Sequence, residues 1–204
     1  METRARLIET GRRLFASQGY NATTVADVAK EARAHPGSLY HAFPTKQDLL
    51  IAVLEDYLAQ FDAHVLEPAW AGIDDPIERV FALLALYRKF LTDTECLFGC
   101  PIGSLALELH EPDPAVRELL ARNFANWIAR VQECLDAAGS RLPVHIDRQH
   151  LASFVLTTME GGVMLARTQR DLAAFDAAVA ILRDYFSLLE TVGARGNYGR
   201  AWLG

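Results

Sequence analysis

The stretch from residue 24 to residue 46, TVADVAKEARAHPGSLYHAFPTK, constrains the fold more than any other part of the chain. Its first apolar residues recur at i, i+3, i+4 and i+7, which predicts a short helix with one apolar face. These residues are Val25, Val28, Ala29 and Ala32. Pro36 stops this helix, because proline lacks an N–H and disfavours helical backbone in the residue before it. The pattern predicts two short helices joined by a tight turn.

The second short helix is expected to begin at Pro36, with His35 as its N-cap. Leu39 and Phe43 lie four residues apart and are expected to face inward. The outward face then carries Gly37, Ser38, Tyr40 and His41. Small residues let the backbone approach phosphate, and hydroxyl and imidazole groups donate hydrogen bonds to nucleic acid. We therefore predict a helix-turn-helix whose second helix lies in the DNA major groove.

Two helices of this region, the one before the turn and the one that follows the second short helix, have recognisable starts. Thr24 with Asp27, and Thr45 with Asp48, fit the pattern of a capping box. A helix N-terminus such as that at Thr24 can also bind phosphate. The residues predicted to contact DNA are Thr24, His35, Pro36, Gly37, Ser38, Tyr40, His41 and Lys46. The alternative for the outward-facing side chains is that they are ordinary solvated surface.

The first quarter of the chain resembles the TetR family of bacterial transcriptional regulators. The matching residues are Leu14-Phe15, Gly19-Tyr20, Thr23-Thr24-Val25, Val28-Ala29, Gly37-Ser38-Leu39-Tyr40, Phe43, Lys46 and Leu49-Leu50. The resemblance implies an all-α protein: a three-helix helix-turn-helix DNA-binding domain, expected at residues 1–47, and a helical ligand-binding and dimerisation domain, expected at residues 48–204.

Two positions depart from the family pattern. The family usually has glycine at the turn where this chain has Arg33. A left-handed turn at arginine costs on the order of 1 kcal/mol, unless the turn takes another geometry. The family also often has a lysine or polar residue where Pro36 stands, so the operator sequence cannot be borrowed from relatives.

Composition narrows the class of protein. The chain has 204 residues, 51% of them hydrophobic, which is ample for a large core. It contains no apolar run of the ~18 residues that a membrane span needs. The charged, amphipathic N-terminus does not fit a signal peptide. Three cysteines without a CxxC pair argue against a disulfide framework or a zinc site. We expect a cytoplasmic protein without metal or other cofactor.

The net charge of −6 is unevenly distributed. Residues 1–50 carry seven basic and five acidic residues, a net charge of +2, which leaves −8 for the remainder. The basic region is therefore confined to the predicted DNA-binding segment. Because phosphate neutralisation supplies most non-specific affinity, we expect weak binding to non-specific DNA.

The rest of the chain shows recurring helix signals and no useful strand alternation. Helices are expected over about 45–65, from Asp75-Pro76 to about residue 91, over 105–109, from Asp113-Pro114 to about 135, from Asp147 to about 165, and over about 173–191. The segment between Cys96 and Gly103 is expected to be broken by Gly99 and Pro101. Gly193 is expected to end the last helix, leaving an irregular tail.

Inward aromatic and methionine side chains of this part are candidates for a ligand pocket, since bundle sites are built from such residues. They are Tyr57, Phe61, Phe90, Phe98, Phe124, Trp127, Met159 and Met164. Core packing is the alternative for each of them. Gly161-Gly162 in mid-helix predicts either a close helix contact or room for a ligand.

The last two long helices resemble the pair that forms a four-helix dimer interface in the TetR family. The positions predicted for this interface are Phe154, Thr158, Gly162, Leu182, Phe186 and Leu189.

These patterns predict a repressor that binds a palindromic DNA operator as a homodimer and is released by a small, largely apolar effector. One alternative is a regulator that senses thiol-reactive compounds through Cys96 or Cys100. Another is a helical adaptor that has lost DNA binding. An enzyme is not indicated, because the sequence has no phosphate loop, nucleophile elbow or metal-ligand spacing.

Overall fold

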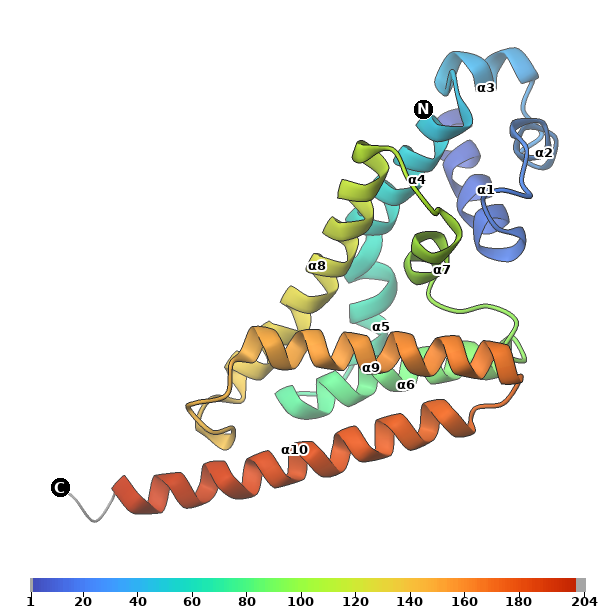
Figure 1. Cartoon of the computed structure of the whole chain (residues 1–204). Helices are drawn as coiled ribbons and strands as arrows, with labels where there is room; N and C mark the ends of the chain where they lie inside the picture. The colour runs from blue at the N-terminus through green and yellow to red at the C-terminus, as the bar shows by residue number, and fades with distance from the viewer. Residues whose placement is uncertain (1, 201–204) are drawn as a thin grey trace. The chain divides into compact units, whose positions relative to one another are not determined.

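The computed structural model describes residues 2–200, apart from the side chains of Glu2, Pro36 and residues 196–200. All regular structure in this range is helical, which confirms the all-α prediction (Figure 1). The helices are α1 (Glu2–Gln18), α2 (Val25–Glu31), α3 (Pro36–Ala42), α4 (Lys46–Phe61), α5 (Glu67–Trp70), α6 (Pro76–Asp93), α7 (Pro101–Glu108), α8 (Pro114–Ala137), α9 (Arg148–Gln169) and α10 (Ala173–Arg200). None of them is both long and apolar enough to cross a membrane.

The chain divides into two compact units, and each is built from two separate stretches of sequence. The first unit is Met1–Phe61 with Cys100–Phe124, and the second is Asp62–Gly99 with Ala125–Gly204. The whole of α4 lies in the first unit. The expected boundary between residues 47 and 48 separates a DNA-binding part from a ligand-binding part, and it stays a prediction. The compact units of the structure divide at other positions.

The first unit is organised around α1, which packs against α2, α3, α4 and α7. Its core contains Leu7, Phe15 and Leu49, all buried. Gly11 allows α1 and α4 to approach closely, because a Cβ there would lie 3.3 Å from side-chain atoms of Leu49 and Val53. Close packing of buried apolar side chains thus forms the α1–α4 contact.

The buried amide of Asn123 holds the first turns of α8 in this unit. Its Nδ2 donates to the carbonyl oxygens of Leu54, at 3.1 Å, and Leu119, at 2.9 Å. A buried amide donor is costly unless it is hydrogen-bonded, so these two bonds stabilise the position.

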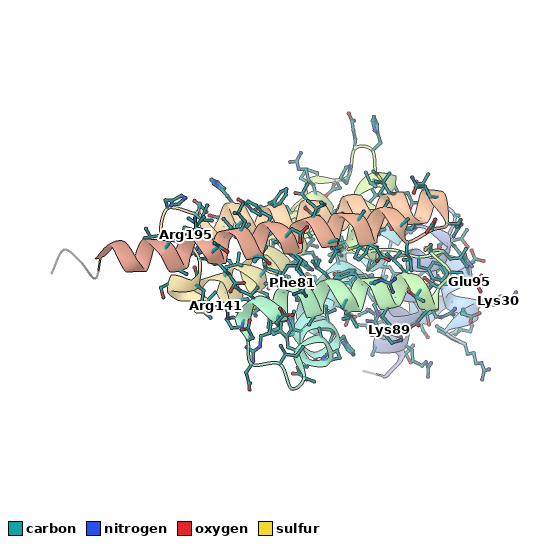
Figure 2. The ribbon with its side chains drawn as sticks, turned by 90° about the horizontal axis from the view of Figure 1, so that it is seen from below. Lys30, Phe81, Lys89, Glu95, Arg141 and Arg195 are labelled. Atoms are coloured by element: carbon teal, nitrogen blue, oxygen red, sulfur yellow. The ribbon has the colours of Figure 1, made fainter. Side chains whose placement is uncertain are left out.

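The second unit contains α9 and α10, which lie side by side, with α6 packed against both (Figure 1). Figure 2 shows Phe81 of α6 on the side facing α10, where its ring meets that of Phe186 edge-on at 5.3 Å. The Arg183 guanidinium covers the Phe81 ring at 3.9 Å. Aromatic and aliphatic burial therefore joins the three helices.

The last helix runs further than the sequence predicted. We expected Gly193 to end it near residue 191, but α10 continues through Arg200, and residues 201–204 lie outside the described range. A Cβ at Gly193 would lie only 2.3 Å from the carbonyl oxygen of Arg141. This glycine marks a close backbone contact, and the prediction of a helix stop was wrong.

Two other helix boundaries differ from expectation. The helix predicted to reach Val65 keeps α-helical geometry only to Phe61 and continues as a π-helical turn, Asp62–Leu66. The short helix expected at 105–109 begins earlier, at Pro101. Proline suits the first position of a helix, where its missing N–H has no partner in any case. The sequence predicted that Pro101 interrupts regular structure, whereas in the structure it is the first residue of α7.

Candidate nucleic-acid interface

Both predicted capping boxes are present in the first unit. The Thr24 hydroxyl accepts from the backbone N–H of Asp27 at 3.1 Å, and the Asp27 carboxylate accepts from the Thr24 N–H at 2.9 Å. Hydrogen bonds from Thr24 hold the pKa of Asp27 below its ordinary value. The same pair of bonds joins Thr45 and Asp48, at 2.8 and 3.1 Å. These caps fix where α2 and α4 begin.

The turn between α2 and α3 is left-handed at Arg33, whose φ is 49°. Of the two geometries open from the sequence, the turn takes the strained one. The Arg33 N–H donates to Lys30 O at 3.1 Å, and the Ala34 N–H donates to Ala29 O at 2.9 Å. These bonds complete the end of α2, so the strain at Arg33 is offset locally.

The second short helix, α3, begins at Pro36 as predicted, with His35 as its N-cap. The His35 Nδ1 accepts from the Gly37 N–H at 3.1 Å. Leu39 and Phe43 are 1% and 2% exposed, and the Arg4 guanidinium lies 5.1 Å from the centre of the Phe43 ring. The inner side of α3 is therefore anchored in the core of the first unit.

The outer side of α3 is solvent-exposed and polar. Gly37, Ser38, Tyr40 and His41 are all exposed, and Tyr40 is 57% exposed. Burial of Leu39 and Phe43 is enough to anchor so short a helix, so folding does not require these exposed residue types. The Pro36 side chain lies outside the described part, so its predicted contact is untested.

Lys46, the first residue of α4, is partly buried beside the segment that joins α1 and α2. Its Nζ lies 4.1 Å from the centre of the Tyr20 ring and donates to Asn21 O at 3.4 Å. Burial lowers the pKa of Lys46, and the nearby Glu108 carboxylate opposes that shift. The ammonium group is thus held in one place on the surface of the first unit.

Comparison with known proteins places this geometry in a family. Residues 7–53 match the family described as bacterial regulatory proteins, tetR family. Residues 76–181, more than half of the chain, match the transcriptional regulator LmrA/YxaF-like C-terminal domain. An uncharacterized HTH-type transcriptional regulator of Mycobacterium tuberculosis is 31% identical over 185 residues, covering 89% of this chain and 92% of that protein.

The chain belongs to the TetR family of transcriptional regulators. The HTH-type transcriptional regulator LmrA of Bacillus subtilis is 30% identical over 175 residues, covering 83% of this chain and 89% of LmrA. The crystal structure of regulatory protein TetR from Rhodobacter sphaeroides superposes with a TM-score of 0.79 at 23% identity, covering 89% of this chain and 97% of that one. This last likeness shows the shared fold.

The residues suggested for the effector pocket of this TetR-family chain are distributed over both units. Tyr57, Phe61 and Phe124 belong to the first unit, and Phe90, Phe98, Trp127, Met159 and Met164 belong to the second. Trp127 and Met159 are buried, whereas Phe90 and Met164 are 42% and 49% exposed. The Trp127 Nε1 has no hydrogen-bond acceptor among the described residues. A buried indole N–H without an acceptor is the kind of group that a ligand can satisfy.

The positions suggested for the dimer interface separate into two groups. Gly162, Leu182, Phe186 and Leu189 are buried within the second unit itself. Of the two adjacent glycines, Gly162 is needed for a close helix contact, because a Cβ there would lie 2.9 Å from the Phe175 ring. A Cβ at Gly161 would meet open space. Because these four residues are buried within one chain, little of their surface is left to meet a second copy.

A different set of apolar side chains forms the exposed face of α9 and α10. Phe154, predicted for the interface, is in this set, and its ring lies 6.2 Å from that of Tyr185. Between the two helices runs a groove of about 840 Å³ lined in part by Phe154, Thr158 and Ile181. The exposed apolar residues of this face are Phe154, Leu165, Ile181, Tyr185, Leu188 and Val192.

The three cysteines of the chain are buried and are not joined in a disulfide. Burial raises the pKa of the Cys134 thiol to about 11. A reactive thiol needs exposure and a depressed pKa, so the buried positions of Cys96 and Cys100 do not favour the thiol-sensor alternative. Among the described residues, no group of three His, Cys, Asp or Glu side chains is arranged to hold a metal ion.

Sequence reasoning missed Tyr20 and Glu108 as parts of the site. Tyr20 entered only as a match to the family pattern, although its ring supports Lys46. Glu108 accepts hydrogen bonds from the segment after α1, 88 residues away in the sequence. Its position at the end of α7 gave no periodic or motif signal, so only the fold could reveal it.

Proposed function

We propose that this protein is a ligand-responsive transcriptional repressor that binds a palindromic DNA operator as a homodimer. The observation that supports this proposal best is the two-sided character of α3. Its buried side consists of Leu39 and Phe43, and its exposed side carries Gly37, Ser38, Tyr40 and His41. A helix anchored on one side and polar on the other suits insertion in the major groove. The protein would act by binding rather than by catalysis, in the cytoplasm where its operator lies.

Phosphate contacts are assigned to Lys46 and to the N-terminus of α2 at Thr24. Lys46 carries a charge at the surface of the first unit, and Thr24 caps a helix whose first N–H groups can bind an anion. Tyr40 and His41 are assigned to the groove itself. Phosphate contacts set position, and base contacts set specificity.

The dimer contact is assigned to the exposed apolar face of α9 and α10. One helix-turn-helix reads only a few base pairs, so specificity requires two half-sites related by the symmetry of the protein. An apolar face of this kind is a feature that marks a protein interface. Phe154, Ile181, Tyr185 and Leu188 would be buried between two copies.

The effector is assigned to the class of small, largely apolar molecules with one hydrogen-bond acceptor. Apolar burial would supply affinity, and the Trp127 Nε1 would orient the acceptor. Release of DNA requires that the effector bind more tightly to a conformation with poorly spaced recognition helices, because equal affinity for both conformations shifts nothing.

The central experiment is a gel shift with the DNA upstream of the gene for this protein, followed by footprinting. We expect a protected inverted repeat and a dimer on the DNA. Binding by a monomer to a site without symmetry would contradict the dimeric part of the proposal. Absence of any DNA binding would favour the adaptor alternative, in which the helix-turn-helix has lost its function.

A further inference from the structure

Glu108, the last residue of α7, is hydrogen-bonded to the segment that joins α1 and α2. Its Oε2 accepts from the Tyr20 N–H at 2.8 Å, and its Oε1 accepts from the Asn21 N–H at 2.6 Å. Hydrogen bonds between backbone amides and an ionised carboxylate are roughly twice as strong as neutral ones. All three residues belong to the first unit.

The residue before Tyr20, Gly19, leaves room for this carboxylate because it has no side chain. Its φ is 87°, and a Cβ there would lie 3.0 Å from both oxygens of Glu108. A larger residue would be strained in that backbone conformation and would also crowd the carboxylate. The segment and the end of α7 therefore fit each other closely.

The two residues that donate to Glu108 are the two that hold Lys46. The Tyr20 ring lies under the Lys46 ammonium at 4.1 Å, and the Asn21 carbonyl oxygen accepts from it at 3.4 Å. Lys46 carries a long flexible side chain, and fixing such a chain costs rotamer entropy. Support that fixes it before DNA arrives removes part of that cost from binding.

We propose that Glu108 is a positioning residue for DNA binding, which holds Tyr20 and Asn21 so that Lys46 is presented to a phosphate. This inference rests on the proposed function, because it requires that Lys46 contact DNA. It assigns a role in DNA binding to a residue outside the 7–53 segment that matches the tetR DNA-binding family.

Two effects of removing Glu108 oppose each other. Loss of a negative charge near DNA favours phosphate binding, whereas loss of the support for Lys46 disfavours it. The two amide N–H groups that donate to the carboxylate offset part of its negative charge. We therefore expect the lost positioning of Lys46 to outweigh the lost charge, so that DNA binding becomes weaker. Glu111 is exposed and forms no ion pair or hydrogen bond within the described part of the chain, so Glu111→Ala measures the effect of charge alone.

The test is a double-mutant cycle between Glu108→Ala and Lys46→Ala, read as the affinity for a mixed-sequence DNA duplex over a range of salt concentrations. Each single variant should bind about tenfold more weakly than wild type, the equivalent of one charge-assisted hydrogen bond. Each should also reduce the salt slope by about one per protomer. The double variant should bind no more weakly than Lys46→Ala, because Glu108 acts through Lys46.

Glu108→Gln is the second variant, since its amide oxygen still accepts one of the two N–H groups and preserves the fold if alanine does not. It should give a smaller loss of the same kind, with a melting temperature closer to that of wild type than the alanine variant has. Additive losses in the double variant would overturn the inference, and so would wild-type affinity in both Glu108 variants. Failure of the wild-type protein to bind both the duplex and its own upstream DNA would instead overturn the proposed function, and this inference with it.

Discussion

At the scale of single residues, the left-handed backbone of Arg33 gives a prediction about stability. Arg33→Gly should raise the free energy of unfolding by up to about 1 kcal/mol, because glycine adopts a positive φ without steric penalty. Arg33→Ala is the control, since alanine keeps the Cβ and therefore the strain. Urea unfolding of both variants measures the difference. Equal stabilisation by glycine and alanine would show that the guanidinium, rather than the backbone, is responsible.

Tyr40 gives a second prediction at this scale. Tyr40→Ala should weaken operator binding at least tenfold, the free energy of one lost hydrogen bond together with its contact area, without lowering stability. Its side chain is 57% exposed, so the fold does not depend on it. Tyr40→Phe separates the hydroxyl from the ring. Fluorescence anisotropy on the footprinted site measures affinity, and wild-type affinity in Tyr40→Ala would place the recognition surface elsewhere.

Local sequence signals were sufficient for the residues that start and anchor the short helices. The caps at Thr24 and His35 and the buried pair Leu39 and Phe43 are where the sequence predicted them. Each depends on neighbours within four residues. Glu108 was not predictable, because its partners lie 87 and 88 residues away and no local pattern distinguishes it from other surface acids.

At the scale of helices, glycines of the same chain are predicted to respond to alanine in opposite directions. Gly161→Ala should raise the free energy of unfolding by up to about 1 kcal/mol, because alanine favours a helix and meets open space there. Gly193→Ala should lower it by roughly 1–3 kcal/mol, since the added Cβ would collide with the Arg141 backbone. Thermal and urea unfolding test both. Destabilisation by Gly161→Ala would show that this position is filled in solution.

The same glycines explain where prediction of the helices failed. Glycine after a periodic segment is a common end signal, so Gly193 was assigned that role. The alternative role of glycine, a close approach of two backbones, depends on a segment some 50 residues earlier that periodicity cannot detect. Helix existence was therefore predictable, while the end of α10 was not.

The start of α6 gives a prediction about pH. Asp75 accepts from the N–H groups of Ile77 and Glu78, at 2.9 and 3.0 Å, and pairs with Arg141. The hydrogen bond from the Glu78 N–H and the contact with Arg141 lower the pKa of Asp75. A lowered folded-state pKa means that the stabilisation is present above the ordinary carboxyl pKa and is lost as pH falls through the folded value.

Asp75→Asn should therefore flatten the decline of stability between about pH 5 and pH 2, because asparagine caps a helix but does not titrate. Unfolding free energy measured across this range checks the effect. Asp74→Asn is the matched control, since the Asp74 carboxylate is exposed and the cap of α6 is made by Asp75 instead. An equal effect of the two substitutions would mean that general charge, rather than the cap and its ion pair, sets the acid response.

At the scale of the whole molecule, the proposed dimer contact can be tested by substitution. Ile181→Asp combined with Leu188→Asp should give a monomer, because two charges would be buried without partners in an apolar contact. These side chains are 69% and 58% exposed, so the fold of one chain should tolerate the change. Light scattering measures mass, and gel shift should show loss of operator affinity. Leu107→Asp, at a 75% exposed position on α7, is the control. A dimer that survives the double substitution would move the interface away from α9 and α10.

The sequence predicted that α9 and α10 carry the interface, which remains a proposal, but it did not predict which side of these helices is exposed. Leu182 and Phe186 share the apolar pattern of α10 with Ile181 and Leu188, and periodicity alone does not say which neighbours each will meet. Packing against α6 and α9 buries the first pair within the chain. The second pair is left on the surface.

The discontinuous make-up of the first unit limits how such a regulator can be re-engineered. A hybrid made by grafting residues 1–61 onto a foreign effector module would leave behind α7 and the first turns of α8. The graft would lose the carboxylate of Glu108 and the amide of Asn123, which bind backbone groups at Tyr20, Asn21 and Leu54. Transplanting the DNA specificity of this protein therefore requires both stretches of sequence, with a host that accepts two splice points.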